Sequence, residues 1–117
     1  MTKTMVTSIG QDAYFEDYPI LVLFNEDAPA ELKDICILHQ FINTPEPDTF
    51  VSGAKVRFDE AEYTITEVGN VAFENFSRLG HLSFHFGSEI DVLPGSIGLD
   101  RAKVPRLRLD SLIEFTH

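Results

Sequence analysis

The feature of this sequence that most limits its fold is a series of short runs rich in β-branched and aromatic residues, separated by turn residues. Such side chains favour strands, because they pack well on a pleated surface. Many short strands with turns between them are typical of a sandwich or small barrel, and barrel closure removes exposed sheet edges. The sequence therefore predicts a mostly β fold, namely a small closed or partly open β-barrel with one or two short helices. The predicted strands are Thr4–Ile9, Ile20–Phe24, Ile35–Phe41, Lys55–Phe58, Tyr63–Val68, His81–Phe86, Ser96–Leu99 and Leu112–Thr116.

Two segments are predicted to be helical. Pro29–Asp34 favours a short turn of helix, with Pro29 in the first turn, where its missing N–H is tolerated. Asn70–Leu79 is the stronger prediction, because Asn70 is a good cap and the next residue, Gly80, favours a left-handed stop. The predicted apolar face of this helix comprises Ala72, Phe76 and Leu79.

The intervening residues predict turns and a single domain. A chain of 117 residues can bury a core, and it shows no internal repeat, linker or low-complexity tract. We therefore expect residues 1–117 to form one domain. The predicted turns are Gly10, Asn25–Asp27, Asn43–Asp48, Asp59–Glu60, Gly87–Ser88 and Pro94–Gly95.

The charge of the chain limits its partners. A formal net charge of −10 argues against nucleic acid, whose binding depends on neutralising phosphates with Lys and Arg. Acidic residues crowd the first third, whereas the segment Arg101–Arg108 is basic, with no role that the sequence defines. The acidity is explained either by solubility or by steering of a protein partner with a positive face.

Location follows from cysteine content and hydropathy. Met1–Gly10 has Thr and Ser where a signal peptide needs an apolar core. No apolar stretch approaches the ~20 residues that cross a bilayer, so direct membrane insertion is not expected. The single cysteine, Cys36, cannot form an internal disulfide. A cytoplasmic location is the expectation.

Nucleophilic chemistry at neutral pH draws attention to the four histidines, since imidazole is largely neutral there. With a strand period of two, His39 shares a face with Ile35, Ile37 and Phe41. This alternation fits a core histidine with satisfied nitrogens. It equally fits a reactive histidine at the end of a strand, ringed by apolar surface for a docking partner.

The other histidines differ in their settings. His81 follows the predicted helix stop at a loop-to-strand junction, a common place for site residues. His85 is predicted to be an ordinary surface residue, and His117 is the last residue. Strand residues 81 and 85 lie roughly 13 Å apart, too far to share a metal ion. No motif for a metal, a nucleotide or another cofactor is present, and Pro94–Gly98 lacks the spacing of a nucleophile elbow.

Three blocks of the sequence resemble the IIA component of the glucitol/sorbitol family of the bacterial sugar phosphotransferase system. The first runs from Phe24 to His39, and the third is Leu93–Ser96. The second and most distinctive comprises Val68–Ala72, Asn75, Leu79-Gly80-His81 and Phe86. One departure is Phe41, where relatives carry a second histidine, and Asn43–Gly53 also differs.

The resemblance implies a phosphocarrier that takes a phosphoryl group from phospho-HPr and passes it to the IIB component for glucitol/sorbitol-type sugar uptake. It implies a phosphohistidine intermediate and places the phosphoryl acceptor at His39. We expect His81 to be the neighbour that holds a phosphate oxygen. Two alternatives remain: the acceptor is His81, or the barrel is a non-catalytic protein-interaction or ligand-binding module. No motif in the sequence specifies the transported sugar, the ring nitrogen that is phosphorylated or the oligomeric state.

Overall fold

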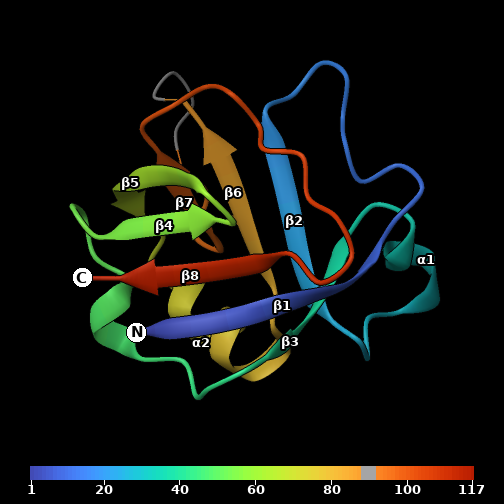
Figure 1. The fold of residues 1–117 in the computed structure, drawn as a ribbon, viewed down its shortest axis with the longest axis horizontal. Helices are drawn as coiled ribbons and strands as arrows, with labels where there is room; N and C mark the ends of the chain where they lie inside the picture. The colour runs from blue at the N-terminus through green and yellow to red at the C-terminus, as the bar shows by residue number, and fades with distance from the viewer. Residues whose placement is uncertain (88–91) are drawn as a thin grey trace.

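The computed structural model, which describes residues 1–87 and 92–117, is a closed barrel of eight strands with two short α-helices (Figure 1). The prediction of a small mostly β barrel is therefore confirmed. Each predicted strand is present, with ends shifted by at most two residues. The strands are β1 (Thr2–Ile9), β2 (Ile20–Asn25), β3 (Ile37–Phe41), β4 (Lys55–Phe58), β5 (Ala61–Val68), β6 (Leu82–Phe86), β7 (Ser96–Leu99) and β8 (Leu112–Thr116).

The strand order around the barrel is β1-β3-β2-β6-β7-β5-β4-β8, and β8 pairs with β1 to close it. Two of the pairs, β2–β3 and β6–β7, are parallel, and the others are antiparallel. Each parallel pair needs a crossover, and the β2–β3 crossover contains α1 (Ala30–Lys33). The pairing of the first and last strands brings the two chain ends together on one side of the molecule (Figure 1).

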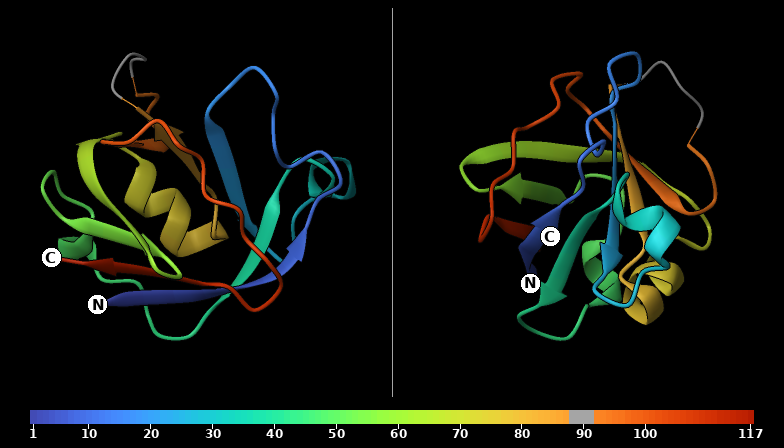
Figure 2. Two further views of the ribbon diagram at one scale, coloured as in Figure 1. Left: turned by 45° about the horizontal axis from the view of Figure 1, so that its top comes forward. Right: turned by 90° about the vertical axis from the view of Figure 1, so that its right-hand side faces the viewer.

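The barrel interior is filled mainly by aromatic and branched side chains. In β8, for example, Ile113 and Phe115 are fully buried while their neighbours are partly exposed, as the strand period of two requires. Helix α2 (Ala72–Leu79) lies across one end of the barrel (Figures 1 and 2), and its Phe76 packs against Phe50 and Phe115. This helix therefore caps the core with its apolar side.

The helix predictions are partly wrong at their ends. The N-cap of α2 is Val71 without a side-chain hydrogen bond, so Asn70 does not cap the helix. Leu79 is 43% exposed, so it is not part of the buried face of α2, which comprises Ala72 and Phe76. The left-handed stop is confirmed, since Gly80 has φ 64° and its N–H donates to the Phe76 carbonyl. Pro29 is the N-cap of α1 and thus precedes its first turn.

Three further details differ from the expected pattern. Strand β3 begins at Ile37 because the N–H groups of Ile35 and Cys36 donate to carbonyls of α1 and complete its last turn. The predicted turn Asn43–Asp48 leads into a 3-10 helix, η1 (Pro47–Thr49). Ser88, in the predicted turn Gly87–Ser88, lies outside the described residues. Among the helices that are described, none combines the length and the apolar character needed to cross a membrane.

Candidate functional site

His39 lies in the middle of β3 with its side chain directed into the barrel, and only 1% of its surface is exposed. Its ring is parallel to that of Phe76 on α2, with centroids 5.7 Å apart and an interplanar angle of 8°. The ring of Phe41 meets it edge-on at 5.2 Å. These two aromatic neighbours fix the plane of the imidazole. In this conformation the ring is not accessible to a partner protein.

Both ring nitrogens of His39 have hydrogen-bond partners. Nε2 lies 2.7 Å from the carbonyl oxygen of Gly80, and Nδ1 lies 2.5 Å from the hydroxyl of Thr4. Because a carbonyl can only accept, Nε2 carries a hydrogen and donates it. In the neutral ring Nδ1 therefore holds the lone pair and accepts from Thr4. The Thr4 hydroxyl also lies 2.8 Å from the Gln40 carbonyl, so its one hydrogen has two acceptors within reach.

Burial sets the charge of this imidazole. It lowers the pKa of His39, because the charged form loses its hydration, and the hydrogen bond to Gly80 opposes this in part. The ring is therefore neutral at pH 7. A neutral imidazole keeps one nitrogen lone pair, which is what a nucleophile requires.

The turn that follows α2 brings a backbone carbonyl against His39. A Cβ built on Gly80 would lie 2.9 Å from His39 Nε2 and 2.9 Å from the backbone nitrogen of Asn25. Gly80 is also left-handed, so any other residue would be both strained and crowded. The block Leu79-Gly80-His81 thus holds the contact to His39 through the backbone of its glycine.

His81 lies next to this contact on the chain, in a different environment. Its ring is partly exposed and stacks on that of Phe24 with centroids 4.7 Å apart. Partial burial lowers the pKa of His81, so this ring too is neutral at pH 7. The structure therefore brings both candidate histidines to the Gly80 turn, one beneath it and one beside it on the chain.

Two expectations about the surroundings of the site are wrong. His85 is buried, with 4% of its surface exposed, and its Nδ1 has no hydrogen-bond partner within residues 1–87 and 92–117. It pairs with Ile20 of β2 and Gly98 of β7, and it belongs to the stretch Phe84–Phe86 of β6, in which every residue is buried. The apolar residue Ile37 is fully buried, so it adds nothing to a docking surface beside His39.

Sequence reasoning missed two groups that hold the imidazole. The hydroxyl of Thr4 comes from β1, and its contact depends on the β1–β3 register, in which Thr4 pairs with Phe41. A weak signal exists, because Thr2 and Thr4 occupy the inward positions of a strand whose next inward residue is Val6. The Gly80 carbonyl carries no sequence signal, because every residue has a carbonyl.

The buried neutral state of His39 predicts a pH-dependent stability. The pKa of His39 is lower in the folded protein than in the unfolded chain. Above pH ~6.5 the ring is mostly neutral in both states, so its titration does not change the free energy of unfolding. At lower pH the unfolded chain binds a proton that the folded protein resists, and the free energy of unfolding falls with a limiting slope of about 1.4 kcal/mol per pH unit for this group. Urea unfolding between pH 5.5 and 7.5 should show a smaller slope for His39→Gln. An unchanged slope in this variant would show that His39 does not contribute.

Comparisons with known proteins agree on one family. The family model described as PTS system glucitol/sorbitol-specific IIA component matches residues 1–114. The glucitol/sorbitol-specific EIIA components of Escherichia coli (strain K12) and Shigella flexneri are each 31% identical over 98 residues, which are 81% of this chain and 77% of each relative. The crystal structure of a PTS system IIA component from Enterococcus faecalis V583 superposes with a TM-score of 0.85 at 23% identity, covering 98% of this chain and 99% of that one. That structure has the same fold.

Proposed function

Because this chain belongs to the glucitol/sorbitol-specific IIA family of the phosphotransferase system and is a phosphocarrier, we propose that it accepts the phosphoryl group from phospho-HPr on His39. The group then passes to the IIB component, in support of glucitol/sorbitol-type sugar uptake. The intermediate is a phosphohistidine. The proposal includes a cytoplasmic location, in line with the unpaired thiol of Cys36.

The observation that carries the assignment to His39 is its contact with the Gly80 turn. The imidazole is neutral, and its plane is fixed by Phe76. Its Nε2 faces the carbonyl of Gly80, whose chain neighbours Leu79 and His81 are at least partly exposed. Positioning of this kind is the main requirement of phosphoryl transfer, since the protein supplies little other covalent chemistry.

Transfer requires that the Gly80 carbonyl leave Nε2, because the buried ring cannot meet a donor. Two features favour such an opening. Glycine at the turn adopts other backbone conformations at low cost. The adjoining Leu79 is 43% exposed, so few core contacts resist its movement. In this proposal the described conformation is the closed state, and docking of phospho-HPr stabilises the open one.

Thr4 would then fix the tautomer of the open state. Once the Gly80 carbonyl has moved away, the ring hydrogen shifts from Nε2 to Nδ1. Nδ1 then donates to the Thr4 hydroxyl, and that hydroxyl donates to the Gln40 carbonyl. Nε2 is left with its lone pair. His39 Nε2 attacks the phosphorus atom in line. The N–P bond of phospho-HPr breaks, and the nitrogen of HPr recovers the electron pair of that bond. In this proposal the N–H of His81 and backbone amides of the turn hold the phosphoryl oxygens.

A labelling experiment tests the acceptor. The protein is incubated with labelled phosphoenolpyruvate, enzyme I and HPr, and the label is mapped by peptide analysis. We expect acid-labile label on the peptide that contains His39, complete loss in His39→Gln, and retention in His85→Gln, a control at another buried histidine. His81→Gln should slow the transfer without moving the label.

Two outcomes would contradict the proposal in different ways. Label on His81 would identify it as the acceptor, an alternative favoured by its partial exposure. No label on any residue, with HPr itself labelled, would instead support the non-catalytic interaction module.

A further inference from the structure

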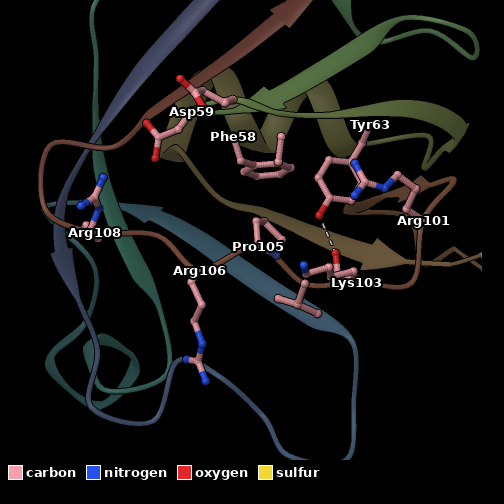
Figure 3. Close-up of a pocket in the computed structure, with 11 residues that line it drawn as sticks. Phe58, Asp59, Tyr63, Arg101, Lys103, Pro105, Arg106 and Arg108 are labelled. Carbon is pink, nitrogen blue, oxygen red and sulfur yellow. Dashed lines mark hydrogen bonds between the residues drawn. The ribbon is translucent and has the colours of Figure 1, made fainter.

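A second concave site lies on the barrel, lined by the basic segment near the end of the chain. The groove has a volume of about 860 Å³ (Figure 3). Phe58 and Tyr63 form its apolar floor, and its cationic lining comprises Arg101, Lys103, Arg106 and Arg108. Four of the nine Lys and Arg residues of the chain are thus gathered in one groove.

Two tyrosines hold this basic segment in place. The hydroxyl of Tyr63 donates to the Lys103 carbonyl, and that of Tyr14 donates to the Pro105 carbonyl at 3.1 Å. The Arg101 guanidinium lies 4.6 Å from the centre of the Tyr63 ring, and the Arg106 guanidinium lies 4.3 Å from that of Tyr14. Stacking on a ring restrains each guanidinium. Arg101 Nη1 also donates to the Glu62 carbonyl at 2.8 Å, and the other N–H groups of that guanidinium can still donate to an anion.

The four cations have no acidic partner in the part of the chain that the structure describes. The ion pairs found there involve the N-terminal amine, Lys3 and Arg78. A chain with a net charge of −10 would be expected to pair its few cations. The groove lining also includes the carboxylates of Asp59 and Glu60, so the four cations outnumber the acidic groups by two. An excess of positive charge in a concave surface attracts an anionic ligand.

The arrangement of the side chains favours an extended ligand. In Figure 3, Arg101, Arg106 and Arg108 point in different directions instead of converging on one point, as a single phosphate would require. Their positions span eight residues of irregular chain, at most ~25 Å. Nucleic acid and an anionic membrane would carry their negative charge beyond the groove, against the strongly acidic rest of the protein, and a flat membrane does not enter a groove. We propose that the groove binds an extended acidic segment of a partner protein.

The groove and the His39 site lie at opposite ends of β6. Ala102, beside Arg101, lies 3.3 Å from the position that a Cβ on Gly87 would take, just after the end of β6. His81 comes just before its start. In Figure 1 the first half of the basic segment runs along the top of the view, whereas α2 lies at the bottom. An acidic segment can therefore occupy the groove while the Gly80 turn stays free, and this inference is independent of the chemistry at His39.

Binding of a fluorescein-labelled hexaglutamate peptide, followed by anisotropy at low salt, tests the inference. We expect saturable binding that weakens about tenfold or more in the double variant Arg106→Ala/Arg108→Ala. The matched control Lys33→Ala/Arg78→Ala changes the net charge equally, at exposed positions outside the groove, and should bind as the parent does. Circular dichroism would establish that both variants are folded, and labelling by phospho-HPr should be the same in both.

Four results would overturn the proposal. Equal loss of binding in both double variants would mean a non-specific charge effect. Displacement of the peptide by inorganic phosphate at equal concentration would mean a small-anion site. Stronger binding to anionic vesicles than to the peptide, lost in Arg106→Ala/Arg108→Ala, would mean a membrane surface. Self-association of the parent that disappears in the same variant would mean that a second copy of this chain is the occupant.

Discussion

Replacing Phe76 with alanine is expected to lower the free energy of unfolding by about 3–5 kcal/mol. Phe76 is fully buried on α2, and its ring contacts those of Phe41, Phe50, Phe115 and His39. Truncation removes these contacts and leaves a cavity that a closed barrel cannot collapse to fill. Because a domain of this size has a total stability of about 5–15 kcal/mol, the variant should approach unfolding in mild denaturant.

Urea unfolding followed by circular dichroism measures this loss, and Leu79→Ala is the matched control. Leu79 is on the same helix but 43% exposed, so its truncation should cost less than about 1 kcal/mol. Similar losses in the two variants would mean that α2 contributes by its helical structure alone, without the anchoring role of Phe76.

The second large effect is expected for Gly80→Ala, which should lower the free energy of unfolding by about 2–4 kcal/mol. A left-handed conformation costs an alanine about 1–2 kcal/mol. The new methyl group would also lie 2.9 Å from both His39 Nε2 and the Asn25 backbone nitrogen, so the turn must shift. That shift should break the bond between His39 and the Gly80 carbonyl, with a change in the ¹⁵N chemical shift of Nε2. Under the proposed mechanism, the rate of phosphoryl transfer to His39 should change as well.

Gly53→Ala separates strain from crowding in this experiment. Gly53 also has a positive φ, of 93°, but no atom lies within 4 Å of its potential Cβ. The backbone cost alone therefore applies there. If Gly53→Ala is as destabilising as Gly80→Ala, and the Nε2 signal of Gly80→Ala is unchanged, the close packing of Gly80 on His39 does not contribute to the free energy of unfolding.

The fold was largely predictable because its strands are marked by local chemistry. The run Lys55–Phe58, for example, alternates polar and apolar residues and is followed by the turn residues Asp59–Glu60, so its ends agree with the structure. The closing pair β1–β8 and the parallel pairs are set by packing between distant segments, which no local pattern encodes. The start of α2 likewise could not be predicted from local propensity. Asn70 is a favourable capping residue, but in the structure the helix begins one residue later, with Val71 as its N-cap.

The sequence singles out two candidate histidines, but it does not predict how the fold places them. The alternation in Ile37–Phe41 fits an inward histidine and an outward one equally, and only the position of α2 decides that Phe76 covers His39. His85 was misplaced for a related reason. Its polarity predicts exposure, but Phe84, His85 and Phe86 are all buried, so burial in this part of β6 does not follow the alternation of the strand.

The pairing of β1 with β8 has a consequence for how the protein is made. On the ribosome β1 emerges before the rest of the barrel, yet one of its two neighbours is β8, the last of the eight barrel strands in chain order. Until Leu112–Thr116 leaves the exit tunnel, one side of Thr2–Met5 has unpaired backbone groups and the aromatic interior is open to water. Nascent chains stalled before this point should therefore bind chaperones and be cleaved readily by proteases, and the emergence of Leu112–Thr116 should end both.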